Sequence, residues 1–442
     1  MRNTFKIGGI HPAPNKTASR KIELLPLPMK VCMPLSQHIG APSKAVVVRG
    51  DKVVRGQIIA ENGSFVSAEL HAPISGTVTA IDDVVLPWGK PSKAIVITAS
   101  EEEHTADTAA REDYWRGMIP HVSDRSLSER LSAEDIRAKI LGAGIVGLGG
   151  ATFPSHVKLT VKPEQKPEIL IINGCECEPY LMCDDALMCT WPGRIAEGVE
   201  LMMKAAGIPQ AVIAVEDNKL EAAAALRDAL THSKNITLKV LKTKYPQGGE
   251  KQLIEAVTGR RVGAGQLPLS VGAVVNNVAT AFAVWQAVAM AQPLIERVVT
   301  VTGDIPESQR VNYMVALGTP LSELPATIPD DVLAIVGGPM MGRSAVRLDA
   351  PVMKGTSGLT LLRRSTSRPV EACIRCGACV EACPMGLEPY LISTYGRLRM
   401  WEEARGADVL DCLECGACSY SCPASRPLLD YIKVAKQRAR NI

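Results

Sequence analysis

The sequence lacks any strong excess of charge of one sign. Lys and Arg number 49 and Asp and Glu 46, which leaves a formal net charge of +3 over 442 residues. So small an excess gives no electrostatic argument for nucleic acid binding. Hydrophobic residues make up 46% and charged residues 21% of the chain, an ordinary globular balance. The length predicts two to four domains.

Membrane-directed segments are also lacking. Residues 1–10 contain no apolar core of the kind that a secretion signal needs. Residues 262–295 contain no charged residue, but Pro268, Pro293 and several Asn and Gln residues interrupt them. A spanning helix needs about 20 mainly apolar residues in a row. We therefore interpret this stretch as a buried strand at 273–275 and a buried helix at 279–291, in a soluble chain or one peripheral to a membrane.

Cysteine, by contrast, is plentiful, and eight of the 13 cysteines form two copies of one pattern. Each copy has gaps of two, two and three residues and ends in Cys-Pro. Two-cluster ferredoxins hold [4Fe–4S] clusters with this run, and the fourth cysteine of each run ligates the other cluster. We therefore predict one cluster on Cys373, Cys376, Cys379 and Cys422, and one on Cys412, Cys415, Cys418 and Cys383.

Zinc and disulfides are the alternatives for these cysteines. Zinc sites usually use four ligands in two pairs, which two runs of four that end in Cys-Pro match poorly. Disulfides suit small secreted domains, and the start of this chain shows no secretion signal. The pattern therefore predicts single-electron transfer, and the many cysteines predict a reducing compartment.

The remaining sequence predicts a multidomain α/β protein. Residues 1–100 resemble the barrel-sandwich fold of lipoyl and biotinyl carrier domains. The matching hairpin, residues 62–69, contains no modifiable lysine, so we expect a structural or docking module without an attached group. We further expect a polar linker at 101–130, a small β-grasp-like domain at 296–365 that binds a soluble ligand, and the ferredoxin module at 366–442.

Strands and helices alternate over residues 131–295. We expect strands at 169–172, 211–215, 236–241 and 273–275, and helices that begin near residues 132, 193, 219, 250 and 279. This alternation predicts a Rossmann-like α/β layer with a largely parallel sheet.

Four polar loops fall at positions that suit a ligand site. A glycine-rich loop at 144–154 precedes Lys158, and polar segments at 173–179, 245–250 and 276–280 follow strands. Glycine-rich loops let backbone N–H groups approach phosphate, although a structural turn is the better interpretation of such a loop alone. Parallel strands end at one edge of their sheet, where α/β folds bind ligands, so we expect the four loops to converge.

The four loops resemble, in order and wording, the flavin- and NADH-binding subunit of respiratory complex I. Over nearly its whole length the chain is more similar still to the family of C subunits from Rnf (also called Rsx) ion-translocating electron transport complexes. That resemblance implies noncovalent FMN, NAD(H) and two [4Fe–4S] clusters. It also implies a peripheral place on the cytoplasmic face of a bacterial membrane, beside membrane subunits and a ferredoxin or ferredoxin-like partner. The implied activity passes electrons between ferredoxin and NAD(H), coupled to Na⁺ or H⁺ movement.

The resemblance also implies roles for individual residues. Positions that match flavin contacts are Gly147, Gly149, Lys158, Asn173, Glu176, Asn276, Asn277 and Thr280. Positions that match contacts to the nicotinamide nucleotide are Phe153, Glu178 and Glu250, and the matched cofactor segments further include Tyr245 and Gly248. No side chain is expected to act as acid or base. Departures from the complex I pattern include Cys175, Cys177, Gly249, Lys251 and Ala279.

Three alternatives remain open at this point. One alternative is a third cluster on four further cysteines, Cys175, Cys177, Cys183 and Cys189. Their gaps fit no common cluster run, which favours ordinary packing. A second alternative is a soluble flavin–iron–sulfur reductase, such as a cobalamin reductase. In that relative, however, the glycine-rich loop lies close to the N-terminus. The third is a cluster-carrying scaffold whose flavin site has decayed.

Overall fold

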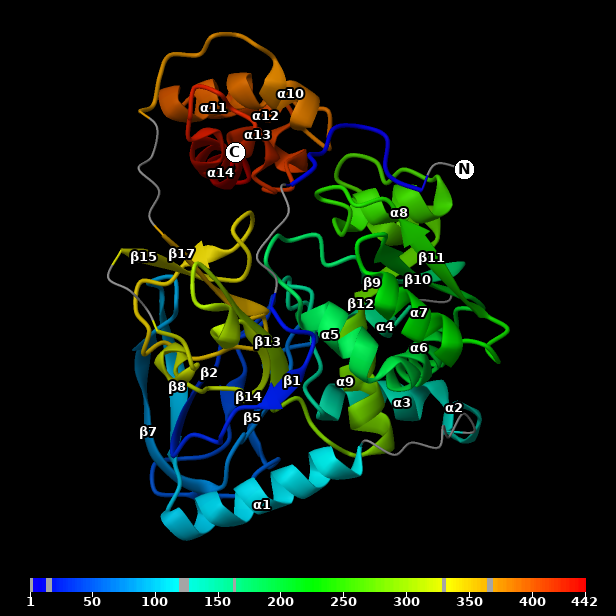
Figure 1. The fold of residues 1–442 in the computed structure, drawn as a ribbon, viewed down its shortest axis with the longest axis vertical. Coiled ribbons are helices and arrows are strands. Elements are labelled where there is room, and N and C mark those ends of the chain that lie inside the picture. Colours follow the sequence, from blue (N-terminus) through cyan, green and yellow to red (C-terminus); the bar gives the residue numbers. More distant parts are fainter. Residues whose placement is uncertain (1–2, 13–17, 119–126, 162–163, 328–330, 364–368) are drawn as a thin grey trace.

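The computed structural model describes residues 3–12, 18–118, 127–161, 164–327, 331–363 and 369–442. Figure 1 shows a β-rich part at the lower left, an α/β layer at the right and a helical C-terminal module at the top. The first described residues run between the C-terminal module and the α/β layer (Figure 1).

The N-terminal β-rich part consists of two small sheets packed on each other. Its shared core holds fully buried apolar side chains, among them Val31, Ile59, Leu70 and Ile97. The strands of the first sheet, in spatial order, are β2 (Lys30–Pro34), β8 (Pro91–Thr98), β7 (Gly76–Val85) and β4 (Lys52–Val53). Those of the second are β3 (Lys44–Ala45), β5 (Ile58–Glu61) and β6 (Leu70–His71). The predicted barrel-sandwich architecture agrees with this arrangement.

Helix α1 (Glu101–Gly117) occupies most of the segment that was expected to be a linker, so that expectation is wrong for these residues. Ser100 is the N-cap of the helix and forms a capping box with Glu103. The acidic side chains of the first turn interact favourably with the positive end of the helix dipole. Arg111 lies in the interior and donates to Leu25 O at 2.5 Å and Met314 O at 2.8 Å. Asp107 of the same helix accepts from Ser75 N at 2.5 Å and from Ser75 Oγ at 2.8 Å in the barrel, so the helix contacts both parts. Residues 119–126 lie outside the described residues.

The α/β layer has the predicted parallel sheet. Its strands, in spatial order, are β11 (Ile236–Leu241), β10 (Ala211–Glu216), β9 (Ile169–Gly174) and β12 (Ala273–Asn277), all parallel. Leu170 and Ile172 of β9 pack into the main core with α6 and α9, whereas Ile171 packs on the other face with Leu253 of α8. This alternation follows from the two-residue period of a strand.

Seven helices of the described chain belong to this layer. They are α3 (Ala133–Gly142), α4 (Ser155–Leu159), α5 (Cys183–Thr190), α6 (Pro192–Ala206), α7 (Leu220–Ala229), α8 (Glu250–Thr258) and α9 (Val278–Ala289). Ser132 caps α3 and Gly207 ends α6 in the left-handed region, as the sequence predicts. Helix α5 was not predicted, because its eight residues show no clear amphipathic pattern.

A six-stranded mixed sheet lies between the barrel and the α/β layer (Figure 1). Its strands, in spatial order, are β1 (Ile22–Leu24), β14 (Val311–Ala316), β13 (Glu296–Gly303), β17 (Gly358–Arg363), β15 (Val332–Val336) and β16 (Arg343–Ser344). The parallel pairing of β1 with β14 takes residues 22–24 out of the barrel segment in which the sequence placed them.

The C-terminal module is helical around a small core of Ile392, Val409, Leu428 and Ile432. Its helices are α10 (Ala378–Ala382), α11 (Pro389–Leu398), α12 (Trp401–Gly406), α13 (Ala417–Tyr420) and α14 (Leu428–Ala439). Helices α11 and α12 are separate, because Arg399 adopts a left-handed φ of 60° between them.

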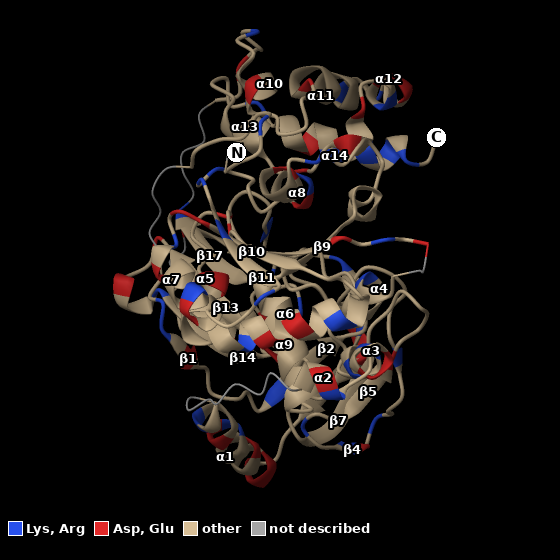
Figure 2. Ribbon diagram, turned by 90° about the vertical axis from the view of Figure 1, so that its right-hand side faces the viewer, with Lys and Arg blue, Asp and Glu red and all other residues tan. Residues whose placement is uncertain are grey.

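No helix within the described ranges is both long and apolar enough to cross a membrane. Figure 2 shows Lys and Arg interspersed with Asp and Glu along the ribbon, in keeping with the small net charge.

Lys354 joins the barrel, the glycine-rich loop and the six-stranded sheet. Its side chain is fully buried, and Nζ donates to Glu69 O and to Gly144 O, both at 2.7 Å. Burial lowers the pKa of Lys354 to about 7. Gly144 has a φ of +63°, and a Cβ there would lie 2.3 Å from Glu69 O. A side chain at position 144 would therefore strain this junction, which explains the glycine there.

We predict that Gly144→Ala lowers the free energy of unfolding by more than about 2 kcal/mol, because it combines a left-handed backbone with a backbone clash. Gly142→Ala is the matched control, because a Cβ at Gly142 meets nothing within 4 Å. It should be neutral or stabilising by up to about 1 kcal/mol. Chemical denaturation of both variants measures the difference, and equal stabilities would contradict this account of the junction.

Candidate functional site

The glycine-rich loop forms a tight turn between α3 and α4. Gly147 N donates to Phe153 O at 2.8 Å, and Thr152 N donates back to Gly147 O at 3.1 Å. Leu148 N donates to the hydroxyl of Thr280 on α9 at 2.9 Å. The loop is therefore fixed to the helix that follows β12, which brings two of the four predicted loops together.

Asn173, at the end of β9, holds the loop at residues 245–250. Its side-chain Nδ2 donates to Gly248 O at 2.9 Å, and Cys177 Sγ accepts from Gly248 N at 3.3 Å. A Cβ at Gly248 would lie 3.2 Å from Cys177 Sγ. These contacts join the loops at 173–179 and 245–250, and Asn277 Nδ2 donates to Asn173 O at 3.4 Å, which joins them to the 276–280 loop. The predicted convergence at the carboxyl edge of the sheet is therefore confirmed.

Two asparagines end β12 at the same edge. Asn277 caps α9 by accepting from Ala279 N at 2.8 Å, and a Cβ at Gly149 would lie 3.3 Å from Asn277 Cβ. Asn276 is buried, and its Nδ2 has no hydrogen-bond partner among the described residues. A buried donor without a partner is costly. This free donor, at the edge where the four loops meet, therefore fits a bound flavin.

Lys158 and Glu250 form an ion pair beside these loops. Lys158 Nζ lies 2.8 Å from Glu250 Oε1, and the two side chains are 31% and 40% exposed. Water screens such a pair, so it contributes little to stability. Both groups remain available to a phosphate or a nucleotide, which are the ligands that the sequence predicted for them.

Glu178 reaches from the α/β layer to the six-stranded sheet. Its carboxylate accepts from Met340 N at 3.1 Å and from Met341 N at 2.6 Å. Burial raises the pKa of Glu178 to about 7, although the two N–H donors lower it in part. A Cβ at Gly338 would lie 2.2 Å from Glu178 Oε2. The role of this 337–342 loop was not predicted, because the Gly-Gly-Pro stretch of the loop is the only signal in the sequence.

The second cysteine run and Cys383 line one cavity in the C-terminal module. Its other lining residues are mainly apolar and include Leu387, Ile392, Leu413 and Ile432, and its cysteines are Cys383, Cys412, Cys415 and Cys418. Burial raises the pKa of Cys415 to about 11 and that of Cys418 to about 12. Cluster binding at this site therefore has to displace thiol protons.

The first run lies nearer the surface. Cys373 and Cys376 are exposed and Cys379 is half-buried. Burial and the neighbouring Cys422 raise the pKa of Cys379. Cys383 thus lies with the second run and Cys422 beside the first, as the predicted exchange of fourth ligands requires.

The spacing of the sulfur atoms argues against a single zinc ion at either run. Both runs lie within described residues, and in neither do three Sγ atoms lie within 4.8 Å of one another. Tetrahedral zinc with bonds of about 2.3 Å requires closer sulfurs. The four-cysteine sets therefore fit clusters.

A buried seam joins the four loops to the second cysteine run. Tyr245 is 1% exposed, and its hydroxyl donates to Cys415 O at 2.7 Å. We define the seam by its buried apolar residues, which are Ile10, Tyr245, Ala382, Cys415 and Ala417. Tyr245, predicted within the cofactor segments, thus contacts the backbone of a predicted cluster ligand.

The N-terminal segment fills part of this seam. Gly9 N donates to Ala382 O at 3.0 Å, and Ile10 exchanges backbone hydrogen bonds with Tyr245 at 2.9 and 2.8 Å. A Cβ at Gly8 would lie 2.2 Å from Cys383 O. Close backbone approach therefore explains the glycine pair near the start of the chain.

Three protein-family models match separate stretches of this chain. A model described as the Nuo51 FMN-binding domain matches residues 140–286, and a model of the 4Fe–4S dicluster domain matches residues 372–425. A model of the RnfC barrel-sandwich hybrid domain matches residues 3–102. The molecule is therefore an electron-transfer protein with an FMN-binding domain and a dicluster domain.

Three relatives extend the similarity over the whole chain. The chain is 42% identical to the C subunit of the proton-translocating ferredoxin:NAD⁺ oxidoreductase complex of Clostridium ljungdahlii, covering 100% of this chain and 95% of that protein. It is 40% identical to the C subunit of the Na⁺-translocating complex of Acetobacterium woodii (98% and 96% covered). It is 41% identical to the C subunit of the ion-translocating oxidoreductase complex of Rhodobacter capsulatus (97% and 82% covered). The chain belongs to the RnfC family, the C subunits of ion-translocating ferredoxin:NAD⁺ oxidoreductase complexes.

A solved structure shares the fold at low sequence identity. The NAD⁺-reducing [NiFe]-hydrogenase in its H₂-reduced state matches with a TM-score of 0.50 and 19% identity, covering 84% of this chain and 74% of that chain. At this identity the match supports the fold alone.

We predict that Tyr245→Phe destabilises the seam by about 1–3 kcal/mol, because Cys415 O loses its buried donor. The variant should keep both clusters but change the electron paramagnetic resonance spectrum of the one nearer the seam. Tyr420→Phe is the control, since Tyr420 is 57% exposed in the same module. Identical stability and spectra in Tyr245→Phe and wild type would show that this hydrogen bond has no effect.

Proposed function

We propose that this subunit binds NAD(H) directly beside its FMN and converts two-electron transfer into single-electron transfer. A bound flavin supplies that conversion, because it exchanges hydride with a nicotinamide and single electrons with clusters. The observation that carries the proposal is the seam: Tyr245 and Gly248 belong to one loop, with Tyr245 bonded to Cys415 and Gly248 to Asn173. The predicted flavin contacts and a predicted cluster site are therefore adjacent.

The chain's own residues divide the work at the flavin site. Gly147 and Gly149 bring the loop backbone close to the ligand, and Asn173 and Asn276 offer amide groups beside it. Lys158 offers a cation to phosphate or to an anionic ring. Three predicted contacts remain. Asn277 and Thr280 fix this loop to the start of α9, where both have hydrogen-bond partners. Glu176 accepts from Asp184 N and Asp185 N at the start of α5.

Phe153, Glu178 and Glu250 are proposed to position the nicotinamide nucleotide. Phe153 lies on the glycine-rich loop, and Glu250 begins α8 opposite Lys158. Glu178 holds the 337–342 loop, so a nucleotide that enters here meets the six-stranded sheet as well as the α/β layer.

The two cluster sites are proposed to have different positions in the electron path. The second-run site with Cys383 is the inner site, because it is largely buried and contacts Tyr245. The first-run site is the outer site, because Cys373 and Cys376 are exposed. The outer site is therefore the face for a ferredoxin or ferredoxin-like partner.

We further propose a peripheral place on the cytoplasmic face of the bacterial membrane, beside the ion-translocating subunits of the complex. Either Na⁺ or H⁺ serves as the coupling ion, since the relatives' names include both. The full-length similarity to RnfC proteins, with their barrel-sandwich domain, disfavours the soluble reductase alternative.

The proposal is tested by anaerobic NADH titration of protein loaded with FMN and reconstituted clusters. Visible and electron paramagnetic resonance spectra should show both clusters becoming reduced. Cys418→Ser should stop reduction of the outer cluster, whereas Cys376→Ser should leave the inner cluster reducible. Protein that binds no FMN, or whose clusters do not respond to NADH, would support a scaffold with a decayed flavin site.

We predict that Glu178→Ala weakens reduction by NADH at least tenfold with both clusters intact, because the variant frees the 337–342 loop beside the nucleotide site. The exposed Glu102→Ala, in the first turn of α1, is the control and should behave as wild type. Rapid mixing with NADH measures the rate, and absorbance measures cluster content. Loss of the clusters in Glu178→Ala would mean that Glu178 supports the seam instead.

A further inference from the structure

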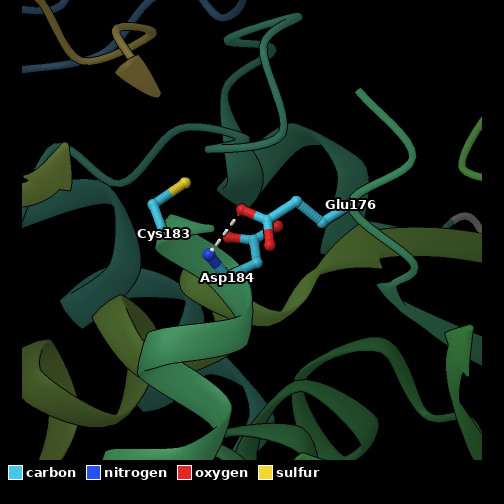
Figure 3. A group of neighbouring side chains, drawn as sticks. All are labelled: Glu176, Cys183 and Asp184. Carbon is cyan, nitrogen blue, oxygen red and sulfur yellow. Dashed lines mark hydrogen bonds between the residues drawn. The ribbon is translucent and has the colours of Figure 1, made fainter. Parts of the chain in front are cut away.

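Two buried carboxylates and a thiol meet where β9 leads into α5. Figure 3 shows Glu176, Cys183 and Asp184 pointing toward one another. Their ligand-type atoms lie within 4.8 Å of one another, and the side chains are buried. Two carboxylates held this close in the interior repel each other unless a cation or a proton lies between them.

Glu176 accepts two backbone hydrogen bonds and faces an ammonium group. Its Oε1 accepts from Asp184 N at 2.8 Å and its Oε2 from Asp185 N at 3.1 Å, at the start of α5. Lys219 Nζ lies 3.4 Å from the same Oε2. The helix N-terminus and the ammonium group both favour the charged form. Any proton on the pair therefore belongs to Asp184, whose Oδ2 accepts from Asn277 Nδ2 at 2.6 Å.

The charges around the pair are one cation short. The buried carboxylates are Glu176, Asp184, Asp185 and Glu216, and the cations that face them are Lys219, Arg297 and Arg20. Four carboxylates face three cations, so a proton on one carboxylate balances the cluster, and Asp184 and Glu216 are the two whose pKa burial raises. An uncompensated charge in the interior is costly.

A proton satisfies this deficit better than a metal ion does. Lys219 already contacts Glu176, and Arg297 lies against Cys183 and Asp184. A divalent cation would be placed beside both positive groups. Burial raises the pKa of Cys183, so its thiol stays neutral and offers no strong metal ligand.

Glu176 is itself a predicted flavin contact, and Asp184 contacts another, Asn277. Asn277, which bonds Asp184, also lies against Gly149 and donates to Asn173 O at 3.4 Å. A cavity of about 20 Å³ is lined by Asp184, Arg297 and Leu148 of the glycine-rich loop. That space suffices for one water molecule.

We propose that Asp184, paired with Glu176, is the buried acceptor for the proton that is left when the two electrons of a hydride from NADH leave one at a time through the clusters. This inference rests on the proposed function. The complete oxidation of NADH yields NAD⁺, one proton and two electrons. The clusters carry the electrons away but not the proton, so an interior group has to take it.

The exit for the proton lies along α5. Asp185 adjoins Asp184, and its Oδ1 is buried without a hydrogen-bond partner among the described residues. Its Oδ2 accepts from Arg20 Nε at 2.8 Å, and the Arg20 side chain is 37% exposed. Asp185 therefore connects the buried pair to solvent.

The other charged groups on the elements packed against α5 have partners of their own. From α7, Glu221 is exposed and pairs with Arg20 at 2.9 Å. From β13, Glu296 is compensated by Arg111 and Arg55. From α6, Glu197 accepts from Trp285 Nε1 at 2.8 Å, with Arg194 over the same ring. Helix α9 carries no charged residue. Glu23 of β1 pairs at 3.2 Å with Lys21, which directly precedes that strand.

The titration behaviour agrees with this geometry. Burial, and then the neighbouring Glu176, raise the pKa of Asp184 to about 7. Burial also raises the pKa of Glu216 to about 8. A carboxyl with a raised folded-state pKa binds more protons when folded than unfolded. Its contribution to stability is therefore lost as pH rises from about 4 through about 7.

Infrared difference spectroscopy of the FMN-free protein between pH 6 and pH 9 tests the proton without any cofactor activity. Wild type should show a carboxylic acid band, and Asp184→Asn should lose a component of that band. Asp184→Asn should also lose less stability than wild type between pH 5 and pH 8. Glu197→Gln, which removes a buried carboxyl elsewhere, should keep the wild-type band and pH profile.

The second measurement uses the FMN-loaded protein. The slope of the flavin midpoint potential against pH reports the protons taken up per two electrons, and it should be smaller in Asp184→Asn than in wild type near neutral pH. An unchanged band and an unchanged slope in Asp184→Asn overturn the proposal. Stoichiometric binding of zinc by wild type but not by Asp184→Asn would also overturn it, in favour of a metal site. Failure to bind FMN leaves the infrared result valid and contradicts only the proposed function.

Discussion

The hydrogen bond from Tyr245 to the carbonyl of Cys415 is the contact on which the arrangement of the electron-transfer sites depends. It joins a loop of the α/β layer to a cysteine run 170 residues later, inside a seam of buried residues. Asn173 holds the same loop from β9 through Gly248. These two contacts fix the position of the predicted flavin contacts relative to the second cysteine run. A fixed position matters, because single-electron transfer requires fixed and close donors and acceptors.

Buried polar groups hold the other domains around this seam. Lys354 uses two carbonyls from different segments, and Glu178 accepts two N–H groups from the 337–342 loop. Lys354 is fully buried and Glu178 half-buried, and each leaves costly unsatisfied groups if its partners move. The proposed nucleotide site is thus bordered by the α/β layer and the 337–342 loop, whereas the glycine-rich loop alone would make only a turn.

The sequence predicted well where one local pattern decides the structure. The apolar run at 169–172 forms β9, and the helix expected near residue 132 begins after Ser132. Gly207 ends α6, and the polar loops meet at the sheet edge. Contacts between distant segments escaped prediction. The pairing of β1 with β14 and the bond from Tyr245 to Cys415 depend on tertiary packing, which no local pattern encodes. Helix α1 was missed because its charged residues resemble a linker, although a capped acidic first turn also marks a helix start.

Iron anomalous scattering from crystals of the FMN-loaded, cluster-loaded protein tests the central claim most directly. The account predicts two iron positions, with the one nearer the flavin held by Cys383, Cys412, Cys415 and Cys418 beside Tyr245. A nearer cluster held by Cys373, Cys376 and Cys379 would contradict the inner and outer assignment, and so would a flavin bound away from the seam.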